Sequence, residues 1–451
     1  MSDIYSHDDG LEYSDIQQEI LSLVEKAYSI YGKEISSALA LLTEAEQKLK
    51  LVDDKKFSLT VETNSHIIKS SIYRSTSEYD KAFNHVDIAL KSAQSLKNKE
   101  LELEALSRYS ILYYQTDKLD ISLDYNDRAL TLAKELKKND VISRIYTTYG
   151  VICDKMHQLD KALEYYFRSI AIDENDKDNS SNYCNIGIIY LKKCDYNSAL
   201  EYCLKGLENI DKIKNLQALS FQYNTIGIVY RRMRNFENAM KYYYKALEIY
   251  KKIDNKEQIA YTYFEIGLTL NNMEQYDEAL EYLFKALAIF QDIQATSHIS
   301  FVCNSIGLIY KEREEYDEAL KYLIKSKDIS ETLINRTTLG ASFNNIGLIF
   351  LKKKEYEQAL DHIKQALEIF REYDQKSNEA GALINIGITY LEMQKYENAL
   401  KYGFDGLEIA SNIVEKEWIK NAYELISESY FFIEDYKNAY EYRVKYIELY
   451  K

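Results

Sequence analysis

Apolar residues recur along this chain at helical spacing, in pairs of stripes separated by short polar turns such as Arg234-Asn235 and Glu274-Gln275. Each pair of stripes predicts a helix, a tight turn and a second helix. An isoleucine-glycine step lies in the first stripe and recurs every 40 residues, at Gly187, Gly227, Gly267, Gly307, Gly347 and Gly387. A fixed period of this length indicates a stacked array of similar units.

An alanine follows each of these glycines by twelve residues, at Ala199, Ala239, Ala279, Ala319, Ala359 and Ala399. A glycine inside a helix costs about 1 kcal/mol relative to alanine, so a compensating contact is expected. Without a β-carbon the first helix can lie close to its partner, and the alanine allows the same from the second helix. Aromatic residues beside both positions then fill the space between pairs.

The same frame extends in both directions with small residues in the glycine and alanine slots. The pairs are Gly150 with Ala162, Ser110 with Ser122, Ser70 with Ala82, and Ser427 with Ala439. We therefore expect a tandem array over 63–451, with units starting near residues 63, 103, 143, 180, 220, 260, 300, 340, 380 and 420. The third unit is three residues short, and we place the deletion in the loop around 173–178.

The segment before the array carries a weaker version of the pattern. Residues 13–50 contain two amphipathic stripes, and Ala38 and Ala45 stand seven apart as in a second repeat helix. We expect 13–62 to form a degenerate first repeat that caps the array. The acidic residues 1–12 are expected to form a disordered tail.

The motif Ile226, Gly227, Tyr230, Ala239, Tyr243 and Ala246 resembles that of the tetratricopeptide repeat family, and the likeness runs from residue 63 onward. Two departures matter: the family's usual period is 34 residues and often ends in proline, whereas this chain has a period of 40 and contains no proline. The difference adds about three residues, or ~4.5 Å, to each helix. The chain is thus similar to the long-helix branch, which includes kinesin light chains and bacterial signalling-peptide receptors.

The resemblance implies an all-α fold, a right-handed superhelical solenoid of about ten antiparallel helix pairs. In this family the first helices line a concave groove that holds extended peptides or partner helices. The implied function is that of a non-catalytic peptide-binding or protein-binding module, a bacterial regulator or sensor.

Composition narrows the class of protein further. No stretch approaches 18 consecutive apolar residues, and the amino terminus has no secretory signal, so we expect a cytoplasmic protein that does not enter a membrane. The net charge of −15 opposes binding to nucleic-acid phosphates. Five cysteines without a paired framework are expected to be reduced, packed thiols. Most of the 43 tyrosines fall in three repeat slots, which favours packing over base stacking.

Nothing in the sequence predicts catalysis. The six histidines are scattered, without an HExxH motif, and the glycines occur one per helix rather than in a phosphate-binding loop. We therefore expect no catalytic residue, no metal site and no cofactor.

Polar residues just before the repeat glycines are the candidate binding positions. Asparagines stand two residues before the glycine at Asn185, Asn345 and Asn385, and three before it at Asn224, Asn304 and Asn344. This ladder resembles the one with which the O-linked N-acetylglucosamine transferase solenoid binds peptide backbones. A carboxamide suits that role because it both donates and accepts hydrogen bonds. The alternative is that these asparagines brace neighbouring helices.

Two further sets flank the ladder. Phe221, Tyr261 and Phe301 lie six residues before their glycines, and form either an aromatic binding strip or part of the core between repeats. Lys192, Arg231 and Arg232 lie near the ends of first helices. They could receive a ligand carboxylate or simply complement the helix dipole.

Two alternative functions remain open at this level. The last unit ends in the helix AYEYRVKYIELYK, with no polar capping helix after it. It resembles the unit that leads into the catalytic part of many bacterial histidine kinases and diguanylate cyclases, which suggests the sensor segment of a signalling enzyme. The same helix could instead make the protein a scaffold that self-associates into a homo-oligomer.

Overall fold

The computed structural model describes residues 13–32, 34–172, 179–210, 215–333 and 336–449. Within these ranges the chain forms 22 α-helices and no β-strand, which confirms the all-α prediction. The expected tail 1–12 and the loop 173–178, where we expect the three-residue deletion of the third unit, fall outside the described residues. The chain divides into two compact units, Met1–Val229 and Tyr230–Lys451.

The first unit contains five helix pairs and most of a further first helix. Its helices are α1 (Asp15–Ile30), α2 (Ile35–Leu49), α3 (Lys55–Ser75), α4 (Tyr79–Ser95), α5 (Lys99–Gln115), α6 (Leu119–Glu135), α7 (Asn139–Lys155), α8 (Leu159–Ile172), α9 (Ser180–Lys192), α10 (Tyr196–Asn209) and α11 (Leu216–Arg232). The two stripes expected between residues 13 and 50 are α1 and α2. The first helix of the unit expected near residue 63 begins earlier, at Lys55.

The second unit starts within the last turn of α11 and continues the same pattern. Its helices are α12 (Phe236–Lys252), α13 (Lys256–Asn272), α14 (Tyr276–Asp292), α15 (Thr296–Glu312), α16 (Tyr316–Thr332), α17 (Arg336–Lys352), α18 (Tyr356–Glu372), α19 (Lys376–Glu392), α20 (Tyr396–Asn412), α21 (Lys416–Phe432) and α22 (Tyr436–Glu448). All but the last of these helices have 17 residues.

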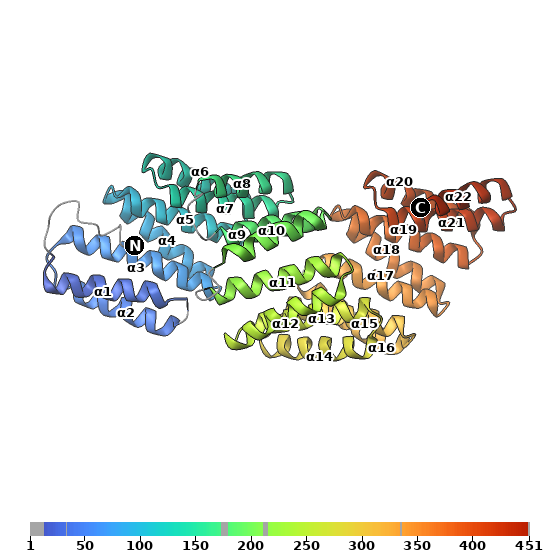
Figure 1. The fold of residues 1–451 in the computed structure, drawn as a ribbon, viewed down its shortest axis with the longest axis horizontal. Helices are drawn as coiled ribbons and strands as arrows, with labels where there is room; N and C mark the ends of the chain where they lie inside the picture. The colour runs from blue at the N-terminus through green and yellow to red at the C-terminus, as the bar shows by residue number, and fades with distance from the viewer. Residues whose placement is uncertain (1–12, 33, 173–178, 211–214, 334–335, 450–451) are drawn as a thin grey trace. The chain divides into compact units, whose positions relative to one another are not determined.

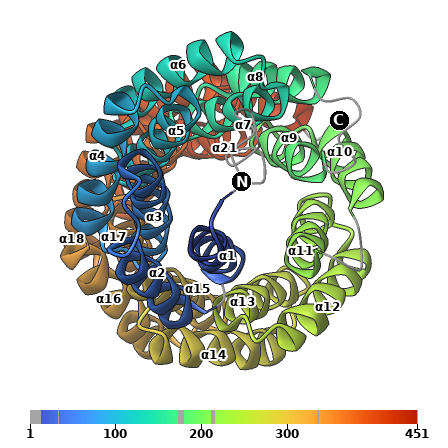
Figure 2. The ribbon, with the colours of Figure 1, turned by 90° about the vertical axis from the view of Figure 1, so that its left-hand side faces the viewer.

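Within each unit the helices alternate between two layers (Figure 1). Second helices pack against their own first helix and against the first helix of the next pair, as α4 does with α3 and α5 and α16 with α15 and α17. Viewed end-on, α3, α5 and α7 lie on the inner side of the first unit, with α4, α6 and α8 outside them (Figure 2). In the second unit α13 and α15 are likewise inside α14 and α16. The first helices therefore share one face within each unit.

The turns between helices use a left-handed residue in place of glycine or proline. Non-glycine residues with positive φ recur about every 20 positions, among them Glu274 (φ 61°) and Val414 (φ 57°). The following backbone N–H reaches back to close the helix end, as Gln275 N–H donates to the Leu270 carbonyl at 3.0 Å. This closure explains how a chain without proline ends each helix sharply.

The repeat glycines allow the close contact that the sequence predicts. A β-carbon at Gly347 would lie 2.5 Å from Cγ1 of Ile363 and 3.0 Å from the Ala359 carbonyl oxygen, both on α18. Real β-carbons do not approach other atoms so closely. Glycine in this slot is therefore required by the packing of α17 on α18.

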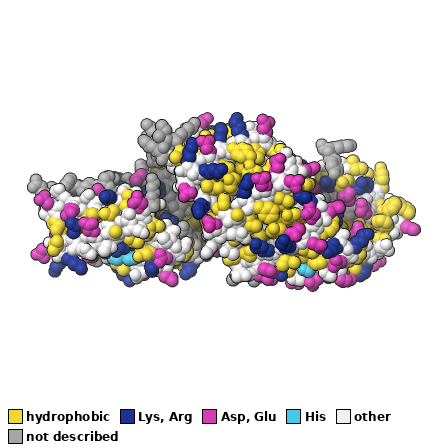
Figure 3. All heavy atoms as spheres, turned by 90° about the horizontal axis from the view of Figure 1, so that it is seen from below, with side chains coloured by type: hydrophobic (Ala, Val, Ile, Leu, Met, Phe, Trp, Pro, Cys, Tyr) yellow, Lys and Arg dark blue, Asp and Glu magenta, His cyan; other side chains and the backbone are white. Residues whose placement is uncertain are grey.

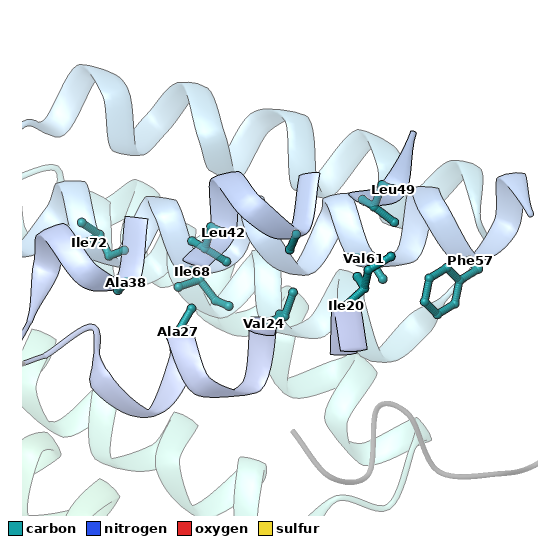
Figure 4. Packing of buried hydrophobic residues seen from close by; sticks show 11 residues of the cluster. Ile20, Val24, Ala27, Ala38, Leu42, Leu49, Phe57, Val61, Ile68 and Ile72 are labelled. Atoms are coloured by element: carbon teal, nitrogen blue, oxygen red, sulfur yellow. The ribbon is translucent and has the colours of Figure 1, made fainter. Parts of the chain in front are cut away.

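Buried aliphatic residues form a core between successive helices of each unit. In Figure 4, Ile20, Val24 and Ala27 of α1 meet Ala38 and Leu42 of α2 and the apolar side of α3. All five named side chains are fully buried. The α1–α2 pair thus covers the apolar side of α3.

Tyrosine pairs explain the high tyrosine content. The residue three after the glycine slot stacks on the residue three after the alanine slot, as in Tyr190 with Tyr202 (centroids 5.5 Å apart) and Tyr390 with Tyr402 (5.5 Å). Lysines lie over these rings from outside, for example Lys205 over Tyr202 at 4.8 Å. Figure 3 shows the resulting mixture of hydrophobic and basic side chains on the face that carries α12, α14 and α16. The repeat slots therefore account for these tyrosines, as the sequence predicts.

Candidate functional site

The candidate site lies on the first helices of the second unit. Asn304 is on α15, Asn344 and Asn345 are on α17, and Asn385 is on α19. Nδ2 of Asn345 donates to Oδ1 of Asn304 at 3.1 Å, and Nδ2 of Asn385 donates to Oδ1 of Asn344 at 3.1 Å. The two hydrogen bonds connect three consecutive first helices, so the asparagines brace neighbouring repeats.

Both hydrogen bonds follow the same register. The residue three positions before the glycine of one repeat contacts the residue two positions before the glycine of the next repeat. In the first unit the same register joins Cys184 to Thr225, with Sγ and Oγ1 3.8 Å apart. Asn224 is buried there, whereas Asn185 is half-buried. The 40-residue period therefore brings these two slots together in all three of these helix pairs.

Bracing leaves much of the hydrogen-bonding capacity of the asparagines unused. A carboxamide has two N–H donors and an oxygen with two lone pairs, and each pair uses one donor and one lone pair. Asn304, Asn344 and Asn345 are only half-buried. Their remaining amide groups can hydrogen-bond a peptide backbone without breaking the pairs.

Aromatic residues flank the asparagines as the sequence indicated, but in different environments. Phe221 in the first unit and Phe301 in the second are 44% and 43% exposed. These two rings therefore do not fill the core between repeats. Tyr261 is half-buried beside Glu265, and burial and that carboxylate raise the pKa of its hydroxyl.

Arg231 is already paired inside the protein. Its guanidinium donates from Nη2 to Oε2 of Glu265 at 3.0 Å, and the two side chains are only 10% and 5% exposed. The hydroxyl of Tyr243 lies 3.5 Å from the same oxygen. Burial opposes the charge of Arg231, yet the Glu265 carboxylate holds its pKa above the ordinary value. A ligand carboxylate at Arg231 would have to replace Glu265.

Glu265 is the residue that sequence reasoning missed. It stands two residues before Gly267, in the slot that holds asparagine in other repeats. The sequence did contain a signal for this ion pair. A carboxylate occupies this slot, and Arg231 stands four residues after the preceding repeat glycine, Gly227. Of the other predicted cations, Lys192 pairs with Asp154 at 2.6 Å, while Arg232 is exposed.

The face of α21 and α22 is a second candidate surface. Phe431, Tyr436 and Tyr440 are 57%, 59% and 74% exposed. They surround a cavity of about 560 Å³, whose full lining is Ser427, Glu428, Phe431, Phe432, Tyr436, Ala439, Tyr440 and Arg443. These are the same repeat slots that α21 covers on the preceding pair α19–α20, so the face has the shape that accepts another helix.

The part of the chain that the structure describes also bears on metal binding, membrane crossing and thiol reactivity. No group of three or more metal-ligating side chains occurs there. None of its helices combines the length and the apolar character that crossing a membrane requires. Four cysteines are buried and Cys194 is exposed, with no disulfide among them. Burial raises the pKa of the Cys184 thiol to about 12, which keeps it protonated.

Family models for the tetratricopeptide repeat match residues 101–175, 180–210, 217–292 and 299–372, more than half of the chain. No curated protein matches the chain.

Solved structures share the fold at low sequence identity. A signal transduction ATPase with a tetratricopeptide repeat sensor from Pyrococcus horikoshii is 16% identical, with a TM-score of 0.55 over 96% of this chain and 72% of that one. Aspartyl phosphate phosphatase F from Bacillus subtilis is 15% identical, with a TM-score of 0.52 over 71% and 94%. The Rap conjugation gene regulator of the plasmid pLS20, in complex with the Phr peptide, is 16% identical, with a TM-score of 0.50 over 70% and 96%.

Proposed function

The chain belongs to the tetratricopeptide repeat family, and from this premise we propose that it is a non-catalytic regulator that holds an extended peptide or partner segment on its first helices. The paired asparagines on α15, α17 and α19 carry the proposal, and those on α15 and α17 are half-buried. They place amide groups at regular intervals along one face. An extended peptide presents backbone N–H and carbonyl groups at regular intervals as well, so the two can match without reading side chains.

The neighbours support a binding role at the level of the fold. The Rap regulator structure contains a Phr peptide, and the Pyrococcus ATPase uses its repeats as a sensor. The phosphatase among them is named for its action on aspartyl phosphate. At 15% identity this likeness concerns the fold alone, and we assign this chain no catalytic residue.

A peptide library displayed on phage supplies the ligand for a test. After selection on the full chain, the enriched peptides are titrated by calorimetry against a variant with Asn344→Ala, Asn345→Ala and Asn385→Ala. We expect at least a tenfold loss of affinity with helicity retained. The control replaces three exposed asparagines away from the first-helix slots, Asn84, Asn398 and Asn412, and should bind normally. Equal affinity of both variants would refute the role of the asparagines.

A second candidate function is self-association through α21 and α22. This surface carries exposed aromatic rings together with Glu428 and Arg443, which have opposite charges. A twofold contact would place Glu428 of each copy near Arg443 of the other, so the surface is complementary to itself. Burial, with Glu424 nearby, raises the pKa of Glu428, and a partner's arginine would relieve that cost.

Light scattering across a concentration series tests this second candidate. We expect a dimer that dissociates in a Tyr440→Glu variant. Tyr373→Glu is the matched control, because Tyr373 is exposed but lies in the turn after α18. A strict monomer at high concentration would exclude self-association and leave this face to another protein.

A further inference from the structure

Two arginines in the first unit occupy slots that are in contact elsewhere in the chain. Arg74 on α3 stands four residues after Ser70, and Arg108 on α5 stands two before Ser110. In the second unit the same two slots, also 34 residues apart, hold Arg231 and Glu265, whose side chains meet at 3.0 Å. Helices α3 and α5 pack against each other. The repeat register therefore places the two guanidinium groups side by side.

The first unit lacks the carboxylate that this register provides in the second. Arg74 forms no ion pair with any residue that the structure describes. The Nε atoms of Arg74 and Arg108, like that of Arg231, are buried without a hydrogen-bond acceptor among those residues. Arg108 makes one long contact, from Nη2 to Oε2 of Glu104 at 3.4 Å. Two donors are thus withdrawn from water and left unused.

This arrangement is unfavourable for the isolated protein. Burial lowers the pKa of Arg74, and the neighbouring charge of Arg108 lowers it further, because like charges repel. A buried donor without an acceptor costs about 1–3 kcal/mol, and more when it is charged. The two guanidinium groups carry two positive charges, and the nearby Glu104 carboxylate carries one negative charge. One positive charge therefore remains in excess. Such a cluster is stabilised by one added anion.

We propose that Arg74 and Arg108 form a binding site for a carboxylate supplied by a ligand. The excess of a single positive charge matches a carboxylate better than a doubly charged phosphate. The planar, forked guanidinium also suits a carboxylate, which it can bind through two parallel hydrogen bonds. In the second unit Arg231 already binds a carboxylate of the chain itself, since its Nη2 donates to Oε2 of Glu265. The site lies in the first unit and does not depend on the asparagine pairs of the second.

Arginine Nε–H signals in nuclear magnetic resonance spectra of the full chain give a direct test. Acetate serves as a free carboxylate, a capped Gly-Glu-Gly tripeptide as a side-chain carboxylate, and inorganic phosphate as the competing oxyanion. We expect saturable shifts of the Arg74 and Arg108 signals with the carboxylates. Tighter binding of the tripeptide would assign the site to a peptide ligand, and equal binding to a small acid. Shifts with phosphate alone, or with no probe, would overturn the proposal.

A pair of variants separates a binding role from a structural one. Arg74→Met removes the repulsion, so we expect a higher melting temperature without carboxylate and at least tenfold weaker carboxylate binding. Arg128→Met removes the same charge from an exposed position on α6 and should leave carboxylate binding unchanged. A lower melting temperature for Arg74→Met with undiminished binding would show that Arg74 is a structural residue and would overturn the site.

Discussion

Asn345 donates a hydrogen bond to Asn304 across 3.1 Å, and this bond joins the first helices of two neighbouring repeats. The pair bears on both readings of the asparagines, since it braces the stack and keeps amide groups available on its face. A double-mutant cycle with Asn304→Ala and Asn345→Ala should show a coupling of ~0.5–1.5 kcal/mol in the free energy of unfolding, the usual net value of such a bond. Urea denaturation followed by circular dichroism measures it. Strict additivity would mean that the pair contributes nothing to stability.

The buried ion pair predicts an asymmetric response to substitution. Glu265→Ala leaves Arg231 charged and unpaired in the interior, so we expect a loss of about 3–5 kcal/mol in the free energy of unfolding. Replacing both partners, as Arg231→Met with Glu265→Leu, should cost far less, because no charge is then left buried. Comparable losses for the single and the double variant would contradict this account.

Replacement of glycine by alanine should change the free energy of unfolding differently at Gly347, a repeat glycine, and at Gly32. Gly347→Ala gains up to ~1 kcal/mol of helix propensity but meets Ile363 and the Ala359 carbonyl, and such overpacking costs ~1–3 kcal/mol. We expect a net loss of about 1 kcal/mol in the free energy of unfolding. At Gly32 an added β-carbon has nothing within 4 Å, so Gly32→Ala should be neutral or stabilising by up to ~1 kcal/mol. Chemical denaturation of both variants decides whether packing explains the repeat.

Replacing Val414 by glycine should raise the free energy of unfolding. Val414 is 73% exposed and adopts φ 57°, a left-handed conformation that costs a β-branched residue ~1–2 kcal/mol. Val414→Gly removes that strain with little loss of packing, so the free energy of unfolding should rise by about 1 kcal/mol. The neighbouring Ile413, at φ −94°, gains nothing in this way, and Ile413→Gly should destabilise the protein. Identical signs for the two variants would argue against strain in the turn.

Two histidines predict a dependence of stability on pH. Nδ1 of His66 and Nδ1 of His85 lie 2.7 Å apart, and burial, with the charges of His66 and Lys69, lowers the pKa of His85 to about 4. Below an unfolded-state pKa near 6.5, the unfolded chain takes up a proton that the folded chain excludes. The free energy of unfolding should therefore fall as pH decreases from about 6.5 toward 4.

Thermal denaturation between pH 7.5 and 5.5 tests this dependence. The fall in melting temperature should be smaller in a His85→Tyr variant, since tyrosine is the usual residue in that slot of the repeat. Parallel curves for the two proteins would place the sensitivity elsewhere.

The spacing of glycine and alanine was enough to predict paired helices, their approximate bounds and the repeat slots that most tyrosines occupy. These features depend on contacts within one repeat or with the next, so the period carries them directly. The turns could also have been found from sequence position, because the left-handed residues recur about every 20 residues. The left-handed positions were not recognised because serine, lysine, aspartate and valine occupy them, where glycine is usual.

The binding positions were only partly predictable. Counting back from each glycine located Asn304, Asn344, Asn345 and Asn385, but not that they bond one another in a fixed register. The sequence suggested that Arg231 receives a ligand carboxylate or complements the helix dipole, whereas in the structure Glu265 lies against it. Arg74 and Arg108 drew no attention, because the contact between slots 34 residues apart became visible only in the structure, at Arg231 and Glu265.

The sequence by itself determined the repeat, because each helix must present its small and apolar residues to adjacent helices at a constant spacing. Only the tertiary structure decided which charges are compensated. Arg231 and Arg74 occupy equivalent slots, yet one meets a carboxylate and the other meets Arg108. The physical reason is that pairing depends on a side chain 34 residues away, in another helix, and on how far both are withdrawn from water.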